Sequence, residues 1–530
     1  MIRNPILPGF HPDPSICRVG GDYFIATSTF EWYPGVEIHH SRDLANWRLA
    51  CRPLDRETQL DMRGNPDSCG IWAPCLSHAD GLFWLVYTDV KRFDGSFKDA
   101  HNYIVTAPAI EGPWSDPIYV NSSGFDPSLF HDDDGRKWFL NMLWDHRPQE
   151  GRKHPAFAGI LRQEWDAAAE KLIGEPKLIF EGSPHGLVEG PHLFKRGGWY
   201  FLITAEGGTG YDHAVTLARS RAIDGPYELH PNRHLLTSKD APEARLQRAG
   251  HGQVIETPAG PYLVHLCSRP LPGLRRSPLG RETALQKCAW RDDDWLYLNH
   301  GAVPADEVEP PLPVQAAPTP QVRARFAPGA LPSEFQWLRT PRPERIFSLN
   351  QRPGKLRLFG RESIGSWFEQ AMVARRQQHF AFRAETEVEF APTTFQQAAG
   401  LALYYNRYKF HFLALTADDS GARVLTVMSC LGDFPGGRLA FPMREIGAPG
   451  SGPVRLQARV DGAALHFAYA QGAGPWTPCG QTLDASLVSD EAGAGEHGSF
   501  TGAFVGMCAF DVSGQGAVAD FSYFDYAPED

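Results

Sequence analysis

The sequence predicts an all-β protein that consists of a five-bladed β-propeller followed by a β-sandwich. The chain has 530 residues, which is too long for one ordinary hydrophobic core, so at least two domains are expected. It contains 14 Trp, 32 Phe, 52 Gly and 44 Pro, and such numbers of aromatic and turn residues are typical of short strands joined by tight turns. Two further observations separate the domains, namely an internal repeat and its loss after a proline-rich stretch.

Five similar segments follow one another in the first part of the chain. They begin at Asp13, Ala73, Asp126, Gly190 and His251, so their starts lie 60, 53, 64 and 61 residues apart. Each has a small residue or Pro, a short alternating run, a Gly turn and an aromatic-rich run, which predicts a strand, a hairpin turn and a second strand. The spacing suits four-stranded propeller blades. Separate hairpins in a sandwich are the alternative, but the regular spacing favours the propeller.

The repeat ends near residue 300, and six prolines follow between residues 303 and 322. Such a stretch predicts an extended, stiff linker. Beyond it, runs such as KLRLFG, FRAETEVEF and GAFVGMCAFDV alternate apolar and polar residues, which predicts a β-sandwich. We therefore expect a propeller over residues 1–305, a linker over 306–324 and a sandwich over 325–530 that contributes to the pocket. The segment 162–174, RQEWDAAAEKLIG, is the clearest helical candidate.

Charge and cysteine content restrict the partners and the location. The net charge is −11 without a long basic block, which argues against nucleic acid or an anionic membrane as the main partner. The N-terminus has no apolar core of signal-peptide length, and no apolar stretch is long enough to span a bilayer. The nine cysteines are scattered, which fits free thiols in a reducing compartment. We expect a cytoplasmic protein.

The repeat also selects three carboxyl groups among many. The first strand of a propeller blade lines the central channel, so the residue that opens it faces the axis at one end. Asp13, Asp126 and His251 occupy that position in blades one, three and five, and Glu189 lies one residue before it in blade four. A single Asp-Pro pair is more often only a turn former. Recurrence at equivalent positions instead predicts that these groups converge on one functional rim.

Carboxyl groups gathered in an aromatic pocket suit the hydrolysis of a glycosidic bond. Their mutual repulsion separates their pKa values, so that one stays protonated as a proton donor while another stays ionised and activates water. Phe30, Trp72 and Trp144 stand where a sugar could stack, although core packing is the commoner role of any one aromatic side chain. No GxSxG, HExxH, P-loop or GxGxxG motif lies in a suitable strand–helix context.

At these residues the sequence closely resembles glycoside hydrolase family 43, in particular its two-domain β-xylosidases. The matching stretches include NPILPGFHPDPSICR, GNPDSCGIWAP, GFDPSLFHDDDG, VEGPHLF, TAEGGT, SPLGRETALQK and GSFTGAFVG. The resemblance implies a five-bladed propeller with a concanavalin-like β-sandwich, and an exo-acting hydrolase that removes terminal β-1,4-linked xylose from xylooligosaccharides. It implies no required cofactor.

The resemblance also implies residue roles. Asp13 is similar to the general base that activates water, Glu189 to the general acid, and Asp126 to the residue that orients Glu189 and adjusts its pKa. The implied mechanism is single-step inversion, for which the carboxyl groups of Asp13 and Glu189 should lie about 6.5–9.5 Å apart. The implied substrate-binding residues are Phe30, Trp72, Trp144, Glu206, Thr209, His251, Arg281 and Phe504, of which Phe504 would close the pocket from the sandwich.

Three departures from the family pattern stand out. Cys75 occupies a position where an acid is usual, and Cys69 stands close enough in sequence for a Cys69–Cys75 link to be an alternative to free thiols. The stretch 269–280 is short, which would alter the aglycone side of the pocket or contacts between subunits. His251 could instead help to hold a divalent cation such as Ca²⁺, although hydrogen bonding in the pocket is favoured because no companion ligands stand out.

Other functions remain open at this level. α-L-Arabinofuranosidase, alone or beside xylosidase activity, is the nearest alternative, because arabinofuranose and xylopyranose present similar hydroxyl patterns. A sugar-binding protein without catalysis is disfavoured, since binding alone does not need a proton donor. A scaffold that binds protein would carry an exposed apolar patch, which a sequence does not reveal. We expect a homo-oligomer, either a dimer or a tetramer.

Overall fold

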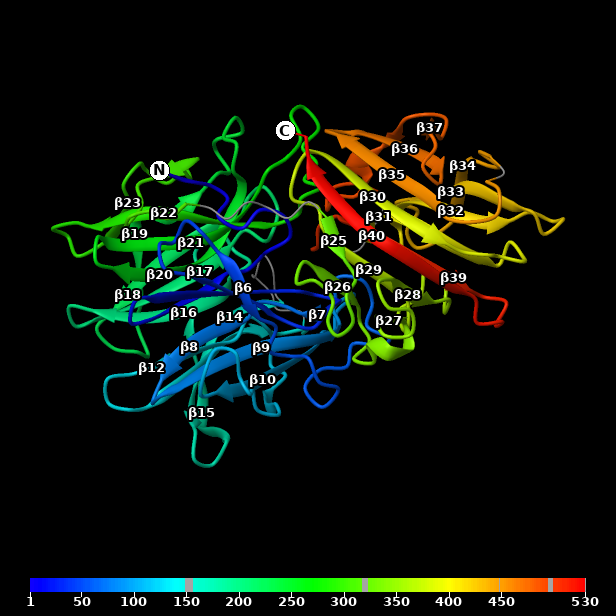
Figure 1. Ribbon diagram of the computed structural model, residues 1–530. Helices are drawn as coiled ribbons and strands as arrows, with labels where there is room; N and C mark the ends of the chain where they lie inside the picture. Colours follow the sequence, from blue (N-terminus) through cyan, green and yellow to red (C-terminus); the bar gives the residue numbers. More distant parts are fainter. Residues whose placement is uncertain (148–155, 317–322, 448, 494–498, 530) are drawn as a thin grey trace.

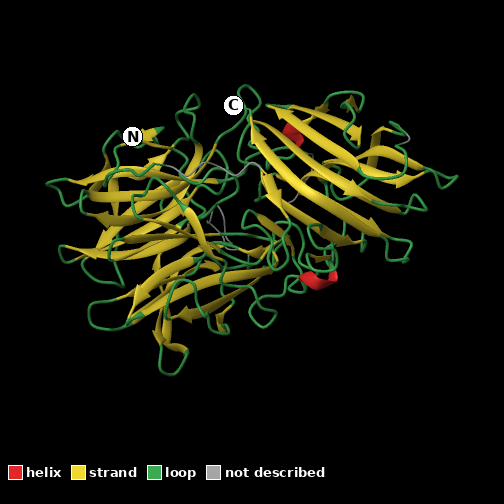
Figure 2. Ribbon diagram, in the orientation of Figure 1, coloured by secondary structure: helices red, strands yellow, loops and turns green. Residues whose placement is uncertain are grey.

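The computed structural model describes residues 1–147, 156–316, 323–447, 449–493 and 499–529. Two bodies lie side by side, the first coloured blue to green and the second yellow to red (Figure 1). Strands make up both bodies, and the described residues contain no α-helix, only the short 3-10 helices η1 (Pro343–Arg345) and η2 (Ala485–Leu487) (Figure 2). Within these described ranges, neither helix has the length and apolarity to cross a bilayer.

The first body contains one antiparallel sheet for each repeat. Blade one has β2 (Ser15–Val19), β3 (Asp22–Thr27), β5 (Glu37–Ser41) and β6 (Arg48–Cys51). Blade two has β7 (Gly70–Ile71), β8 (Cys75–Ala79), β9 (Leu82–Arg92), β10 (Asp99–Ala107) and β11 (Ile118–Asn121). Blade three has β12 (Ser128–His131), β13 (Lys137–Trp144), β14 (Phe157–Asp166) and β15 (Lys171–Phe180). Blade four has β16 (Glu189–Arg196), β17 (Trp199–Glu206), β18 (Ala214–Ser220) and β19 (Glu228–Thr237), and blade five has β20 (Gln247–Thr257), β21 (Gly260–Ser268), β22 (Glu282–Trp290) and β23 (Leu296–Leu298).

The innermost strands close a ring. β2 contacts β8, β8 contacts β12, β12 contacts β16, β16 contacts β20, and β20 returns to β2. Each of these strands opens a sequence repeat, and each pairs with the next strand through a tight turn. Between β16 and β17, Gly197 and Gly198 have φ of 57° and 74°, as a two-residue hairpin turn of the primed type requires. The predicted five-bladed propeller is therefore confirmed.

The helix expected over residues 162–174 is wrong. Residues up to Asp166 belong to β14, and residues from Lys171 belong to β15, so this segment is an outer hairpin of blade three. The Asp166 side chain accepts hydrogen bonds from the backbone N–H groups of Ala168 and Ala169 at 2.9 and 3.0 Å, which closes the turn. Trp165 is buried between blades two and three, and this burial outweighs the helical preference of the Ala and Glu residues in the turn.

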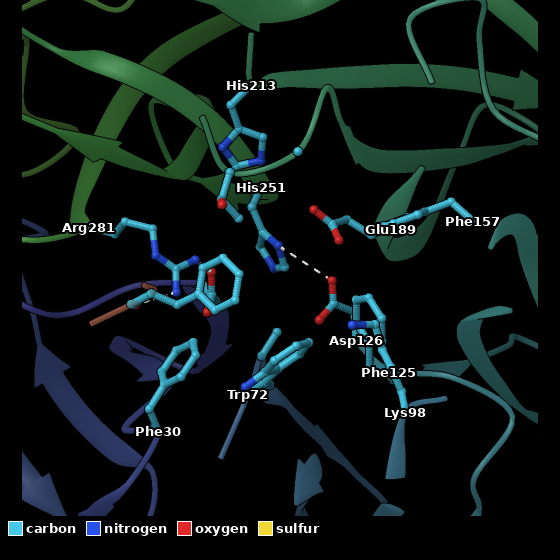
Figure 3. A pocket seen from close by; sticks show the side chains of 15 residues that line it. Phe30, Trp72, Lys98, Phe125, Asp126, Phe157, Glu189, His213, His251 and Arg281 are labelled. Atoms are coloured by element: carbon cyan, nitrogen blue, oxygen red, sulfur yellow. Dashed lines mark hydrogen bonds and ion pairs between the residues drawn. The ribbon is translucent and has the colours of Figure 1, made fainter. Parts of the chain in front are cut away.

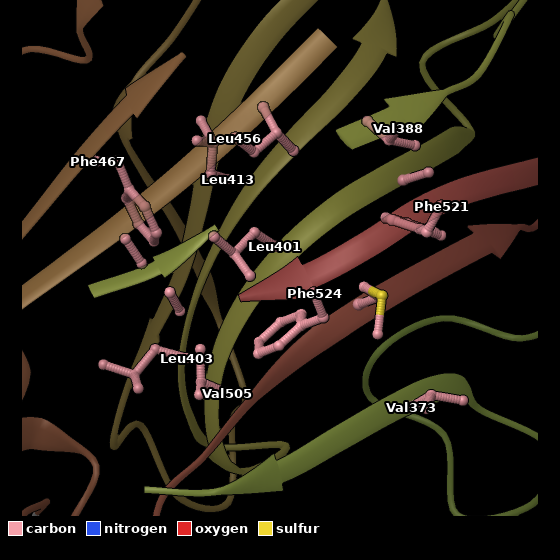
Figure 4. Close-up of a cluster of buried hydrophobic side chains, with 14 of the residues drawn as sticks. Val373, Val388, Leu401, Leu403, Leu413, Leu456, Phe467, Val505, Phe521 and Phe524 are labelled. Carbon is pink, nitrogen blue, oxygen red and sulfur yellow. The ribbon is translucent and has the colours of Figure 1, made fainter. Parts of the chain in front are cut away.

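The second body is a sandwich of two large antiparallel sheets. One sheet contains β25 (Arg323–Arg325), β27 (Phe347–Ser348), β28 (Leu356–Phe359), β30 (Ala381–Glu389), β35 (Val454–Asp461), β36 (Ala464–Gln471), β37 (Thr477–Pro478), β38 (Leu483–Asp484) and β40 (Val518–Pro528). The other contains β26 (Phe335–Leu338), β29 (Ala371–Arg376), β31 (Gln397–Asn406), β32 (Lys409–Ala417), β33 (Arg423–Leu431), β34 (Leu439–Met443) and β39 (Phe504–Asp511). Apolar side chains such as Leu401, Leu456, Val505 and Phe521 fill the space between the sheets (Figure 4).

The second sheet is covered on both faces. Every residue of β31 is buried, unlike the half-buried pattern of an ordinary sandwich strand. Leu401 and Leu403 point into the sandwich core, whereas Ala402 and Tyr404 belong to a cluster that includes Phe10 and other aromatic residues of the propeller. The sandwich is therefore docked on the propeller through an apolar interface.

One strand crosses the domain boundary. β4 (Trp32–Tyr33) belongs to blade one in sequence, but it pairs with β26 and forms the edge of the second sandwich sheet. Trp32 of this strand also stacks on Phe504 of the sandwich, and the two ring centroids lie 3.6 Å apart. The two domains thus share backbone hydrogen bonds as well as apolar surface.

The proline-rich stretch runs along the propeller. Within the predicted linker 306–324, β24 (Glu307–Val308) pairs with β1 (Ile2–Arg3), and the backbone N–H of Gln315 bonds to Asp43 of blade one at 3.0 Å. Residues 317–322 lie outside the described residues, and Arg323–Arg325 already pair with β40 of the sandwich. The linker is therefore fixed against the first domain over the part that the structure describes.

Candidate active site

A cavity of about 200 Å³ lies at the axial end of the propeller, where the blade-opening residues meet the sandwich. Figure 3 shows its side chains converging from several blades. The cavity is lined by Asp13, Phe30, Trp72, Ala73, Lys98, Phe125, Asp126, Phe157, Glu189, Gly208, Thr209, His213, His251, Arg281 and Phe500. All three predicted carboxyl groups are among them.

The blade-opening positions share an unusual backbone conformation. Asp13, Asp126, Gly190 and His251 have φ of 55°, 53°, 57° and 41°, the left-handed region that residues other than Gly rarely adopt. Backbone strain of this kind concentrates at functional sites, where packing holds it in place. The repeat therefore delivers equivalent residues in equivalent conformations from four blades.

Asp13 is a buried acceptor with two side-chain partners. It is 5% exposed, and its Oδ2 accepts a hydrogen bond of 2.6 Å from Ser28 Oγ. Its Oδ1 forms a 2.8 Å ion pair with Arg281 Nη1. The hydroxyl and the guanidinium thus fix the position of an acceptor that can take a proton from water.

Glu189 is a buried carboxyl group with a raised pKa. It is the first residue of β16 and is 8% exposed. Burial first, and then the negative charge of Asp13, raise the pKa of Glu189 to about 8, although Arg281 and Lys98 lower it in part. At neutral pH this carboxyl group keeps its proton. One cavity thus contains a proton donor and a proton acceptor, which is the separation that glycoside hydrolysis needs.

Asp126 interacts electrostatically with both Asp13 and Glu189. Burial and the charges of Glu189 and Asp13 raise its pKa well above the ordinary value of an Asp. Its Oδ2 accepts a hydrogen bond of 3.1 Å from the backbone N–H of Gly190, the residue after Glu189. It is thereby tied to the backbone that carries the proton donor.

His251 also faces Asp126. Its Nδ1 lies 4.0 Å from Asp126 Oδ2 (Figure 3), and burial lowers the pKa of the imidazole. Within the described ranges, the three side chains close enough to share a metal ion are His11, Glu37 and His39, a group that does not include His251. His251 is therefore a buried imidazole with a lowered pKa that faces the carboxyl group of Asp126 across the cavity.

Arg281 joins the carboxylate to the sandwich. Besides its bond to Asp13, its Nη2 donates a 2.8 Å hydrogen bond to the backbone carbonyl of Phe500. Its neighbour in the sequence, Glu282, does not pair with it but accepts hydrogen bonds from Arg269 at 2.7 and 2.8 Å. Arg281 therefore faces the cavity.

Aromatic rings form one wall. Trp72 packs against Phe125 and Phe500 with ring centroids 5.1 and 5.9 Å away. Lys98 lies beside this wall, with its ammonium 4.2 Å from the Trp144 ring centroid and a 2.9 Å hydrogen bond to the Phe93 carbonyl. Burial lowers the pKa of Lys98 to about 8. Apolar ring faces with a few polar groups are a suitable lining for a sugar.

Three residues expected to bind substrate do not line the cavity. Trp144 supports Lys98 and donates its indole N–H to the Ser96 carbonyl at 3.0 Å. Glu206 is fully buried and accepts a 2.6 Å hydrogen bond from the backbone N–H of Ser183. Phe504 lies in the domain interface against Trp32, and the ring that reaches the cavity from the sandwich is Phe500, four residues earlier. Thr209, by contrast, lines the cavity as expected.

Sequence reasoning missed several lining residues, namely Phe500, Lys98, Phe125, Phe157 and His213. Phe125 directly precedes Asp126 and could have been found from that position. Phe500 lies in the stretch GSFTGAFVG that already marked the sandwich contribution. Lys98, in the loop before β10, and His213, just before β18, follow no pattern that would single them out.

The sandwich also holds the pocket by charge. Arg248 is 4% exposed, and its guanidinium pairs with Asp490 at 2.8 Å and with Glu491 at 3.1 Å. Its Nε donates a 2.8 Å hydrogen bond to the Thr209 carbonyl. Within the short stretch 269–280, the Ser277 backbone N–H bonds to Glu491 at 2.8 Å. Both sides of the cavity wall are thus fixed by the second domain.

The cysteines near the pocket are free thiols. Cys69 and Cys75 are both buried and unbridged, so no link joins them. Cys75 Sγ lies 4.0 Å from His192 Nδ1, which shows how a thiol fills the position where an acid was expected. Burial raises the pKa of the Cys75 thiol to about 11, so it carries no charge toward the carboxyl groups at neutral pH.

A propeller whose axial cavity combines a carboxyl group of raised pKa, a second carboxyl group paired with an arginine and an aromatic wall has the features of a glycoside hydrolase. The chain belongs to glycosyl hydrolases family 43, whose sequence model matches residues 2–296. A model for the beta xylosidase C-terminal concanavalin A-like domain matches residues 323–527.

Full-length relatives support this assignment. Xylosidase/arabinosidase 43B of Humicola insolens is 61% identical over 99% of this chain and 98% of its own. The beta-xylosidase of Bacillus subtilis is 48% identical, and 99% of each chain is covered. The crystal structure of xylan beta-1,4-xylosidase from Bacillus halodurans C-125 superposes with a TM-score of 0.94 at 50% identity, covering 99% of this chain and 100% of the other.

Proposed function

We propose that this protein is an exo-acting β-xylosidase that removes single terminal xylose residues from β-1,4-linked xylooligosaccharides by inversion. The observation that carries the proposal is the presence in one small cavity of Asp13, which pairs with Arg281, and Glu189, whose pKa is raised to about 8. The names of the Bacillus subtilis and Bacillus halodurans relatives support the choice of xylose.

In the proposed mechanism, Asp13 takes a proton from a water molecule while the oxygen of that water attacks the anomeric carbon. The bond from that carbon to the leaving oxygen breaks, and Glu189 donates its proton to this oxygen. Asp126 holds the Gly190 backbone and so positions Glu189, while its own raised pKa reflects the shared negative charge. Water and these side chains supply every proton, so we propose that no cofactor is required.

The proposed exo action follows from the shape of the site. A cavity of about 200 Å³ that Phe500 closes from the sandwich has room for little more than one sugar ring. We expect it to take the terminal residue of a chain, with the remainder extending outward.

A proton NMR time course of xylobiose hydrolysis tests this proposal. Inversion at a β-linkage yields α-xylose first, which later mutarotates. The appearance of β-xylose first would contradict the inverting mechanism. Xylobiose that remains intact would contradict the proposed substrate. Activity that survives exhaustive chelation with EDTA is the result expected of a hydrolase without a cofactor.

α-L-Arabinofuranosidase activity is a second candidate. The Humicola insolens relative is named xylosidase/arabinosidase, and a Bacteroides ovatus relative at 32% identity is named a non-reducing end alpha-L-arabinofuranosidase. Comparing kcat/KM for matched aryl xylosides and arabinofuranosides ranks the two activities. If kcat/KM for the arabinofuranoside exceeds kcat/KM for the xyloside, arabinofuranosidase activity becomes the main proposed function.

A further inference from the structure

A second cavity, with polar lining residues, lies in the seam between the propeller and the sandwich. It has a volume of about 220 Å³ and is lined from the propeller by residues including His11, Glu37, His39 and Arg52, and from the sandwich by residues including Arg375 and Arg376. This set, here called the seam cavity, contains more guanidinium groups than carboxylates.

One carboxylate is shared between two guanidinium groups. Glu37 Oε1 accepts hydrogen bonds from Arg52 Nη2 at 2.6 Å and from Arg376 Nη1 at 3.0 Å. The second oxygen, Oε2, lies 3.0 Å from Arg376 Nη2. Glu37 is 2% exposed, and although burial raises its pKa, the two arginines lower it well below the usual range, so the carboxylate is ionised.

The remaining groups leave positive charge in excess. Arg375 is a third guanidinium, and Glu334 is the second carboxylate in the lining, which gives a net charge of +1 when both imidazoles are neutral. They are neutral at pH 7, since burial lowers the pKa of His11 and brings that of His39 to about 3. Burial also lowers the pKa of Arg376 to about 10. Pairing with Glu37 therefore compensates only part of the hydration that this guanidinium loses on burial.

Unpaired donors line the same space. Nε of Arg375 and Nδ1 of His39 are buried and have no hydrogen-bond partner. Both belong to side chains that line the seam cavity, and His39 is 8% exposed. Buried polar atoms are normally satisfied, and an acceptor group in the seam cavity would satisfy the Arg375 donor.

The charge decides which ligand fits. His11, Glu37 and His39 have the residue types and the spacing of a metal site. A divalent cation there would lie beside the guanidinium groups of Arg52 and Arg376, which both pair with Glu37. Repulsion from two guanidinium groups disfavours it, whereas an anion gains from the same charges and accepts hydrogen bonds from the unpaired donors.

We propose that the seam cavity binds a small oxyanion, either inorganic phosphate or a carboxylate, through Arg375 and Arg376. The site then connects to the catalytic end of the propeller, because Arg376 Nε donates a 2.6 Å hydrogen bond to the carbonyl of Phe10, three residues before Asp13. An anion held there bridges the two domains behind the general base.

Isothermal titration calorimetry at constant ionic strength tests this proposal directly and does not depend on hydrolysis. Phosphate and acetate are titrated separately into the full-length protein, and the better ligand identifies the source of the oxyanion. We expect one saturable site per chain and a rise of about 2 °C or more in the unfolding midpoint at saturation.

Arg375→Met should weaken binding at least tenfold, because it removes one guanidinium and leaves the Glu37 pairs intact. Arg375→Lys should keep part of the affinity. Arg444→Met, which removes an exposed sandwich arginine outside the cavity, should bind as the unmodified protein does. Equal thermal shifts in all variants would mean a bulk salt effect and overturn the proposal, as would the absence of heat for both anions. Binding of Zn²⁺ that His39→Ala abolishes would replace the anion by a metal.

Discussion

Replacement of Glu189 by Gln separates proton donation from every other property of the pocket. Glutamine keeps the size of the side chain but carries no transferable proton. With a pKa of about 8, Glu189 is mainly protonated at pH 7, so most enzyme molecules contain the donor. Positioned general acids contribute about 10²–10⁴-fold, or about 2.7–5.4 kcal/mol of barrier. We expect kcat/KM for xylobiose to fall by that factor in Glu189→Gln.

The pH profile gives the sharper readout. In the unmodified enzyme kcat/KM should fall as pH rises through about 8, because a raised carboxyl pKa means that the proton is present below it and lost above it. Glu189→Gln should lose this alkaline limb. Asp126 and Glu189 affect one another's titration, so the limb reports a macroscopic pKa of the pair. Aryl xylosides with good leaving groups should suffer less, since they need little protonation.

A matched control exists in the same domain. Burial raises the pKa of Glu31 to about 8 as well, but this carboxyl group lies outside the cavity and accepts a hydrogen bond from the Ser68 backbone N–H at 3.2 Å. Glu31→Gln should keep the alkaline limb. The reasoning is refuted if Glu189→Gln keeps the limb, if Glu31→Gln removes it, or if Glu189→Gln loses less than about tenfold on xylobiose.

Arg248→Met should lower the free energy of unfolding by about 3–5 kcal/mol, because it leaves two sandwich carboxylates without their buried partner; urea unfolding measures this, and a loss below about 1 kcal/mol would show that the pair is not a domain clamp. Phe500→Ala should raise KM for xylobiose by about 10-fold to 100-fold through loss of the ring that closes the cavity. An unchanged KM would remove Phe500 from the binding surface. Gly190→Ala should lower kcat, since its new Cβ would meet the His251 imidazole at 2.9 Å in a left-handed conformation next to Glu189. Wild-type kcat with wild-type stability in that variant would contradict the need for glycine there.

The repeat made the first domain predictable. Because each blade begins with the same strand and turn, the five segment starts located the inner strands, and the same register identified Asp13, Asp126, Glu189 and His251. The helix expected over 162–174 failed because local preference competes there with the burial of Trp165 between blades, which a sequence window does not contain.

The sandwich side of the pocket was less predictable. The stretch GSFTGAFVG indicated that the second domain reaches the site, but which of its two phenylalanines does so depends on how the strand docks. Phe504 begins β39 and faces Trp32, whereas Phe500 precedes the strand and faces the cavity. Lys98 owes its position to the packing of its loop against Trp144. No periodic pattern in the sequence predicts this contact.

The edge strand β4 implies an order of events during synthesis. Trp32 and Tyr33 pair with residues 337 and 338, and Arg281 near the end of the propeller bonds to the Phe500 carbonyl. At about 5–20 residues per second, the ribosome needs on the order of ten to forty seconds to make the chain from the last blade to the C-terminus. During that interval the aromatic surface around Trp32 and Phe10 remains uncovered on the nascent propeller. Chaperone demand should therefore concentrate in this interval, and a truncated chain that ends after blade five should aggregate.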